Sequence, residues 1–268
     1  MYIYDSVQKT KLAFIPQDKN KVSIYVCGPT VYDDAHLGHA RSSLAFDLLR
    51  LVLESKHYEV TFVKNITDID DKIINKMAKT KQSLEEITQF FTSAYHSDMD
   101  KLGIKRPDIE PKATQSIDAI VQMIQTLFKK NIAYSISNGD IYFDTSKDND
   151  YLSLSCRASD DNQSRIENIQ EKRQNADYAL WKHCKDKDDV CFDTILGKGR
   201  PGWHIECSAM IEKHLHNHDH KFIIDIHGGG ADLLFPHHEN EASQSRCATG
   251  KNLAKYWMHN GFVTVDGQ

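Results

Sequence analysis

The sequence predicts an α/β fold in which a parallel sheet, with helices between its strands, is interrupted by an inserted α+β subdomain. Two β-rich runs, at residues 22–26 and 60–63, flank a stretch with helical spacing of apolar residues, and a third such run comes only at residues 222–226. A long amphipathic pattern and a hairpin pattern lie between them. At 268 residues the chain is long enough for a core domain that carries an insertion.

The first run and the stretch after it form the start of the predicted sheet. The run at residues 22–26 is closed by Cys27, Gly28 and Pro29, and apolar residues then recur at helical steps. These residues are Leu44, Ala45, Leu48, Leu49 and Val52. Together with the run at residues 60–63 they make a βαβ unit, which is typical of a Rossmann-like nucleotide-binding domain with ligands at the carboxyl ends of its strands. We therefore expect a nucleotide site at residues 27–39.

Two helices and a hairpin are predicted next. Ser83, with Glu86 three residues later, is a capping-box pattern that marks a helix start. An apolar stripe over residues 117–128, ended by Asn131, predicts a second helix. Asn-Gly at residues 138–139, between alternating apolar residues, predicts a hairpin over residues 133–144.

The character of the chain changes at the polar, charge-rich residues 145–176. We interpret residues 113–200 as an inserted connective subdomain. Residues 1–112 then form the first half of the sheet domain, and residues 201–268 form its second half. That second half contains the strand at residues 222–226, three glycines and a further short strand predicted at residues 262–265.

Composition excludes several classes of protein. The chain is 40% hydrophobic and 26% charged, as in a soluble globular protein. No run reaches the roughly 20 apolar residues of a membrane-spanning helix, and the amino terminus lacks a secretory pattern, so we expect a cytoplasmic protein without membrane contact. The net charge of −5 means that any RNA contact must use local patches.

The six cysteines lack the spacing of a disulfide framework, so we expect thiols, metal ligands or catalytic groups in a reducing compartment. They are Cys27, Cys156, Cys184, Cys191, Cys207 and Cys247. Alternate histidines in a polar stretch are interpreted as a solvated surface segment rather than a metal site. These are His214, His216, His218 and His220.

The segment at residues 36–39 places His36, Gly38 and His39 between the first predicted strand and helix. Backbone N–H groups and the dipole at a helix amino terminus favour phosphate. The pattern therefore indicates a phosphate site. Taken alone, however, the pattern favours the alternative of a polar loop that contains one packed histidine.

A second group of residues resembles a metal site. His237 and Glu241 are four residues apart after Pro236, so both project from one helical face. Cys207 and Cys27 can complete four ligands of types that zinc accepts in a tetrahedral shell. The alternative is that these cysteines are small buried hydrophobic residues, because sequence distance does not show that they meet.

Five motifs in order along the chain resemble those of cysteinyl-tRNA synthetases, which are class I aminoacyl-tRNA synthetases, and the match covers the catalytic-domain portion. They are CGPTVY at residues 27–32, HLGH at 36–39, NITDIDDKII at 65–74, GWHIECSAM at 202–210 and HGGGADLLFPHHENE at 227–241. The family's Lys-Met-Ser-Lys-Ser loop would follow residue 268. We therefore expect a catalytic fragment with impaired activity of its own.

The resemblance implies a role for each matching residue. One zinc ion per chain is bound by Cys27, Cys207, His237 and Glu241, and the substrate thiolate joins the metal. Gly28, Thr67, Trp203 and Asp232 bind the cysteine substrate. ATP, with Mg²⁺, is bound by Thr30, His36, Gly38, His39, Gly228, Gly229 and Gly230, of which His36 and His39 are catalytic. Without the resemblance, Trp203 reads as a core aromatic residue, Asp232 as a cap, and Thr67 as the cap of the helix after it.

The implied activity is ATP-dependent formation of cysteinyl-adenylate and transfer of cysteine to tRNA(Cys) by the full-length protein. Zinc would separate cysteine from serine, a difference too small for shape alone, so we expect no editing activity. One alternative is a ligase that joins cysteine to an amino sugar. Another is a non-catalytic zinc-binding or RNA-binding module, against which the joint presence of His36, His39, Thr67 and Trp203 argues.

Overall fold

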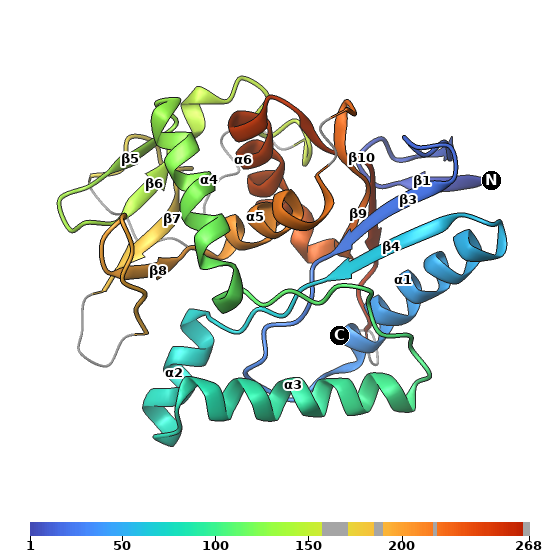
Figure 1. Cartoon of the computed structure of the whole chain (residues 1–268), viewed down its shortest axis with the longest axis horizontal. Coiled ribbons are helices and arrows are strands. Elements are labelled where there is room, and N and C mark those ends of the chain that lie inside the picture. Colours follow the sequence, from blue (N-terminus) through green and yellow to red (C-terminus); the bar gives the residue numbers. More distant parts are fainter. Residues whose placement is uncertain (157–170, 185–189, 217–218, 265–268) are drawn as a thin grey trace.

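A four-stranded parallel sheet organises one end of the molecule (Figure 1). The computed structural model describes residues 1–156, 171–184, 190–216 and 219–264. The strand order is β10-β9-β3-β4, and every neighbouring pair is parallel. The strands are β3 (Lys21–Val26), β4 (Glu59–Lys64), β9 (Phe222–Gly230) and β10 (Asn252–Asn260). The predicted α/β class with a parallel sheet is confirmed.

Helices cover both faces of this sheet. Helix α1 (Leu37–Ser55) connects β3 to β4 and packs Phe46, Leu49 and Leu53 against one face. Helices α5 (Trp203–Leu215) and α6 (Glu239–Thr249) cover the other face. Because side chains alternate along a strand, β3 sends Ile24 toward α1 and Tyr25 toward α5.

The predicted βαβ unit is therefore confirmed, but of the five apolar residues that predicted α1 only Leu49 is buried. Leu44 and Leu48 are 46% and 62% exposed. The buried face instead includes the polar Ser43 and Arg50, and the Arg50 guanidinium donates to the Arg106 carbonyl. Ser43 and Arg50 are thus buried because they form hydrogen bonds with neighbouring segments, although hydrophobicity alone would predict that they are exposed.

The two helices after β4 are α2 (Asp71–Thr80) and α3 (Leu84–Lys101). The capping box predicted for α3 is confirmed, because the Ser83 hydroxyl accepts from the Glu86 N–H and the Glu86 carboxylate accepts from the Ser83 N–H. Helix α2 is capped by Asp70, whose carboxylate accepts from the Lys72 N–H. The alternative that Thr67 caps this helix is wrong.

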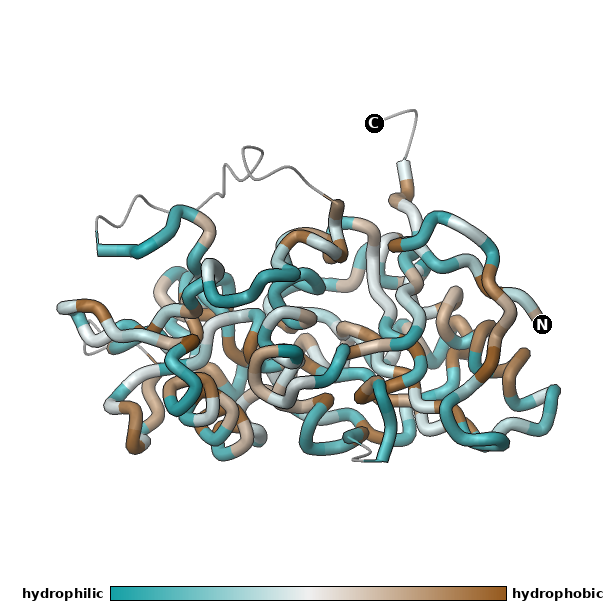
Figure 2. The backbone as a smooth tube through the Cα atoms, turned by 90° about the horizontal axis from the view of Figure 1, so that it is seen from above, coloured by the Kyte–Doolittle hydropathy of each residue, from teal (hydrophilic) through white to brown (hydrophobic). Residues whose placement is uncertain are grey.

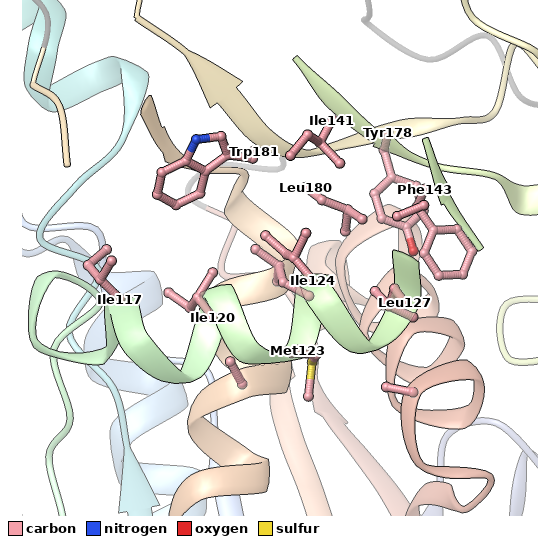
Figure 3. Close-up of a cluster of buried hydrophobic side chains, with 14 residues drawn as sticks. Ile117, Ile120, Met123, Ile124, Leu127, Ile141, Phe143, Tyr178, Leu180 and Trp181 are labelled. Atoms are coloured by element: carbon pink, nitrogen blue, oxygen red, sulfur yellow. The ribbon is translucent and has the colours of Figure 1, made fainter. Parts of the chain in front are cut away.

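A second, antiparallel sheet lies at the opposite end of the molecule, in the order β5-β6-β7-β8 (Figure 1). Its strands are β5 (Ala133–Ser135), β6 (Ile141–Phe143), β7 (Tyr178–His183) and β8 (Gly199–Pro201). Helix α4 (Ile117–Lys129) packs an apolar stripe against this sheet, as Figure 3 shows for Ile120 and Ile124 beneath Leu180. The predicted helix and hairpin are confirmed, whereas the boundaries 113 and 200 remain a prediction.

Short elements complete the fold. Strands β1 (Tyr2–Asp5) and β2 (Thr10–Ala13) form an antiparallel hairpin next to β10, to which Ser6 donates through its N–H. Single helical turns occur at Thr114–Ser116, Thr145–Lys147 and Ala231–Leu233, and an irregular turn with a cis peptide before Pro236 occurs at Leu234–His238. Helix α6 starts at Glu239, so His237 lies in the irregular turn before it.

Two other expectations are wrong. Residues 262–264 form no strand, and Val265 lies outside the described residues; the last strand is β10, whose pattern includes Lys255 and His259. Cys184 and Cys191, whose Cα atoms are 6.2 Å apart, form a disulfide, although no bridges were expected.

Where they are described, the alternate histidines are half-buried rather than fully solvated. His216 pairs with Glu212, and His220 pairs with Asp18, while His218 lies outside the described residues. Hydrophobic and hydrophilic stretches alternate along the tube in Figure 2. Within the described ranges, no helix is long and apolar enough to cross a membrane.

Candidate active site

A cavity of about 500 Å³ opens where the parallel strands end. Its walls come from the residues that follow the carboxyl ends of β3, β4, β9 and β10, as expected for an open parallel sheet. Twelve of the residues singled out from the sequence line it: Cys27, Gly28, Thr30, His36, Gly38, His39, Thr67, Trp203, Cys207, Gly230, Asp232 and His237. One cavity thus collects residues from distant parts of the chain.

The amino terminus of α1 forms one wall. The His36 Nδ1 accepts from the Gly38 N–H at 3.1 Å, and the His39 Nδ1 accepts from the His36 N–H at 3.1 Å. The two imidazoles thus form a capping box, with their ring centres 3.9 Å apart. Burial, followed by the charge of His36, lowers the pKa of His39 to about 4, so this ring is neutral and can accept. At residues 36–39, a packed histidine in a polar loop and a phosphate site are therefore compatible interpretations.

The four predicted metal ligands meet at the opposite wall. One donor atom from each of Cys27, Cys207, His237 and Glu241 lies within 4.8 Å of the others. The two sulfur atoms are 3.9 Å apart, and the Cys27 Sγ lies 3.5 Å from the Glu241 Oε1. The His237 Nε2 lies 2.9 Å from the same oxygen. These residues come from the end of β3, the first turns of α5, the turn before α6 and the first turn of α6.

Neighbouring side chains orient the ligands. The Nδ1 of His237 is 2.9 Å from the Nδ1 of His204, and Trp203 stacks on the His237 ring at 4.3 Å. The Nε2 of His227 lies 2.7 Å from the Glu241 Oε2. Each of these two ligands, His237 and Glu241, therefore has one atom held by a neighbour and one atom aimed at the common centre, as in protein metal sites.

Electrostatics favour the charged forms of Glu241 and Cys207. Burial alone would raise the pKa of Glu241, but His227 and His237 outweigh it and hold this pKa well below its ordinary value. The hydrogen bond from Cys27 lowers the pKa of Cys207 to about 6. Burial raises the pKa of the Cys27 thiol, so this sulfur keeps its proton when the ligands are alone.

A second set of donors overlaps the first. Cys27 and Glu241 also lie within 4.8 Å of His227 and His238. Only Cys27 of this second set lines the cavity, whereas Cys27, Cys207 and His237 of the first set all do. Two thiols, an imidazole and a carboxylate are ligands that zinc accepts, so the first set fits a metal centre that a substrate can reach.

The end of β4 supports the wall between these two regions. The Asn65 carboxamide accepts from the Gly28 N–H at 2.9 Å and donates to the Thr67 hydroxyl at 3.1 Å. Gly28 touches Asn65 so closely that a Cβ would lie 1.6 Å from the Asn65 carbonyl oxygen. Through these two hydrogen bonds, Asn65 connects Gly28, next to Cys27, with Thr67. No role for Asn65 was predicted from the sequence.

The other predicted substrate residues take different positions. Trp203 is 40% exposed at the cavity wall, so it is not a core aromatic residue. Asp232 lines the cavity and approaches Gly230 so closely that a Cβ there would lie 2.3 Å from the Asp232 Oδ1. Gly228 faces the Phe46 ring and Gly229 faces His238, and neither lines the cavity.

Several further residues of the site were missed. Lys64 and Tyr95 line the cavity beside His39, and His204 and His227 support the ligands. Lys64 stands next to a quoted motif, and His204 and His227 lie within two others. Period-two alternation along β4 could have assigned Lys64 to the α1 face, opposite Asn65. The histidine pairs carry no spacing signal, because they depend on the packing of α5 against α6.

Comparisons with known proteins give consistent results. A family model described as "tRNA synthetases class I (C) catalytic domain" matches residues 13–268. A protein of Sulfurovum sp. (strain NBC37-1) is 62% identical over the whole chain, and one of a Nitratiruptor species is 61% identical. Both are named cysteine--tRNA ligase, and the chain spans 58% of each.

A solved structure is similar in fold. Mycobacterium tuberculosis methionyl-tRNA synthetase in complex with methionyl-adenylate matches with a TM-score of 0.68 and 12% identity. The match covers 90% of this chain and 57% of that one. At this identity the likeness supports the fold alone.

Proposed function

The chain belongs to the family of class I (C) tRNA synthetase catalytic domains, and from this premise we propose that the intact protein activates L-cysteine with ATP and transfers it to tRNA(Cys). The observation that carries the proposal is one cavity with a thiol-rich ligand set at one wall and a helix amino terminus at the other. The names of the relatives support the same substrate. We also infer a cytoplasmic location from this role.

The nucleotide is assigned to the α1 wall. The dipole of α1, whose positive end lies at this wall, stabilises negative charge there. Neutral His39 keeps the His36 backbone in place through its Nδ1, so the capping box fixes the shape of this wall. Thr30, Gly38 and Gly230 also line the cavity and allow close approach of a ligand.

The amino acid is assigned to the opposite wall. Zinc bound by Cys27, Cys207, His237 and Glu241 would hold a substrate thiolate and bind a serine hydroxyl far more weakly. Trp203 shields this position through its stack on His237, and Asp232 offers a carboxylate to the substrate ammonium group. Because a methylene-sized difference is worth only about 1–3 kcal/mol in a shape-selective pocket, a thiol-specific contact makes separate editing unnecessary.

The reaction follows from these positions. A carboxylate oxygen of cysteine attacks the α-phosphorus of ATP, the bond to the bridging oxygen breaks, and pyrophosphate leaves with the electron pair. A ribose hydroxyl at the tRNA terminus then attacks the carbonyl carbon of cysteinyl-adenylate, and AMP leaves. No side chain is modified, so the chain contributes orientation and charge stabilisation. The magnesium ion that accompanies ATP enters with the nucleotide.

The alternatives receive no specific support. Neither an amino-sugar acceptor nor a purely structural zinc module is favoured by a feature of the described residues, whereas the family match and the intact ligand set fit the ligase.

Calorimetry tests the proposal. The intact protein, after its zinc content is counted, is titrated with cysteine and with serine, and pyrophosphate exchange into ATP is then measured with each amino acid. We expect about one zinc per chain, cysteine binding and cysteine-dependent exchange. Exchange that proceeds equally with serine, or that fails with cysteine while tRNA and ATP are present, would overturn the proposal.

A further inference from the structure

Lys64, the last residue of β4, has an unusual environment. Its side chain is almost completely buried, with 8% of the residue exposed, and it reaches the cavity beneath the first turns of α1. The ammonium group donates to the Ser43 hydroxyl at 2.8 Å and to the Tyr95 hydroxyl at 2.7 Å. Its nitrogen also lies 5.4 Å from the centre of the Tyr95 ring.

None of these partners carries a charge. No carboxylate in the described part of the chain forms a hydrogen bond or an ion pair within 4.0 Å with the Lys64 ammonium. A buried ammonium group without a counter-charge is costly, so proteins normally pair such a group or use it to bind an anion. Because lysine has three donors and two are used, one N–H remains for a ligand.

The position of Lys64 identifies which end of the cavity it serves. Successive residues of a strand face opposite ways, and the next residue, Asn65, faces Gly28 and Cys207. Lys64 therefore faces the α1 side, where the His39 and Tyr95 rings are 6.4 Å apart. Since His39 is neutral, it does not supply the positive charge that this wall needs.

We propose that Lys64 is a nucleotide-binding residue whose free N–H binds a phosphate oxygen of ATP, while Ser43 and Tyr95 hold the ammonium group in position. This inference rests on the proposed function, because it takes ATP as the ligand of the α1 wall. It implies that the α1 wall binds a phosphorylated nucleotide, because adenosine has no phosphate group to contact Lys64.

A structural role is the competing explanation. Lys64 and Tyr95 also line a second, small cavity of about 30 Å³, together with Asp47. Asp47 is buried, and its Oδ1 has no hydrogen-bond partner. If Lys64 served only to balance this carboxylate at longer range, its removal would lower stability without any preference among ligands.

The experiment compares ligands with and without phosphates. The intact protein and its Lys64→Met and Lys64→Arg variants are titrated with ATP in the presence of magnesium ion, with adenosine and with cysteine, and each is melted in the absence of ligand. Lys76→Met is the matched control, because Lys76 also lies over a ring of α3, that of Phe91 at 4.0 Å, but does not line the cavity.

We expect Lys64→Met to bind ATP about 10- to 100-fold more weakly, as for a lost charge-assisted hydrogen bond, with affinities for adenosine and cysteine nearly unchanged. Lys64→Arg should recover much of the ATP affinity, and Lys76→Met should match the wild type. If Lys64→Met does not fold, Lys64→Gln, which keeps a donor near both hydroxyls, replaces it with the same expectation.

The outcomes separate the two proposals. Wild-type protein that binds ATP more tightly than adenosine, with no change in Lys64→Met, would overturn the role of Lys64 alone. An equal loss for ATP and adenosine, or a lower melting temperature as the sole effect, would also overturn it. Wild-type protein that binds ATP no better than adenosine would overturn the proposed function and this inference together.

Discussion

Substitution of Gly28 by alanine tests whether close packing at the end of β3 holds the proposed metal ligands in place. A Cβ at residue 28 would lie 1.6 Å from the Asn65 carbonyl oxygen, and Cβ contacts under 3.0 Å are essentially never found. The two backbone segments must therefore separate by about 1.4 Å. The atom that the added Cβ meets belongs to the backbone and cannot rotate away as a flexible side chain would. The movement therefore displaces the neighbouring Cys27 from Cys207 and Glu241.

The magnitude follows from packing and hydrogen bonding. Overpacking of this kind costs typically about 1–3 kcal/mol, and loss of the hydrogen bond from the Gly28 N–H to Asn65 adds about 1 kcal/mol. For a chain of this size each kcal/mol lowers the melting temperature by about 2–4 °C, so we expect a fall of about 5–15 °C. Zinc affinity should fall at least about 10- to 100-fold, since even supporting residues have effects of this size.

Differential scanning calorimetry and metal analysis after dialysis against a chelator measure the two effects. Gly261→Ala is the control for stability, because a Cβ at residue 261 would find its nearest neighbour, an Arg41 nitrogen, at 3.8 Å. Unchanged melting and unchanged metal retention in Gly28→Ala would show that the two backbone segments are not in the described contact, and would refute the reasoning.

Three other predictions concern charge. Glu241→Gln should lower the metal content after dialysis from about one ion per chain to well under half, since a buried anionic ligand is lost; mass spectrometry of the native protein measures it. Because the pKa of His39 is lowered from 6.5 to about 4, the unfolded state binds more protons in that window, so stability falls as pH decreases from 6.5 to 4. Between pH 6.5 and 4, the free energy of unfolding of His39→Asn should fall by about 1 kcal/mol less than that of the wild type. Urea titrations measure this difference, and the value allows for solvent screening. Arg246→Ala should lower the free energy of unfolding, measured in urea, by about 3 kcal/mol, because it leaves the buried Asp148 carboxylate without its cation.

Each of these predictions has a clear failure. Full metal retention in Glu241→Gln would remove this residue from the ligand set. Identical acid sensitivity of His39→Asn and wild type would mean that His39 titrates normally in the folded protein. A loss below about 0.5 kcal/mol in Arg246→Ala would place the ion pair with Asp148 in the class of weak surface pairs.

Most of the parallel sheet could be predicted because its strands have a strong local pattern. Residues 22–26 and 222–226 are largely apolar runs, as strands buried on both faces usually are. Strand β10 was missed because Lys255 and His259 interrupt its pattern, while the apolar pair Phe262 and Val263, which follows it, stays outside the sheet. Local hydrophobicity does not report which segment finds a neighbouring strand.

The candidate site was predictable to a different degree in each part. A spacing of four residues connects His237 with Glu241, and their side chains lie 2.9 Å apart as expected, although His237 belongs to the turn before α6. No spacing rule connects Cys27 with Cys207, which are 180 residues apart, so this pair depended on the resemblance to a known family. Lys64, His204 and His227 depend on side-chain direction and on contacts between separate elements, which become visible only in three dimensions.

The central position of β3 affects the order in which the protein can be completed during synthesis. Strand β3 pairs with β4 soon after it is made, but its other edge pairs with β9, which starts at Phe222. At typical translation rates the nearly 200 residues between them take about 10–40 s to appear. For that time the nascent chain presents an open, apolar strand edge, which is a template for intermolecular pairing. The same long-range pairing that brings Cys27 next to Glu241 thus makes folding slow and leaves the unfinished chain prone to aggregation.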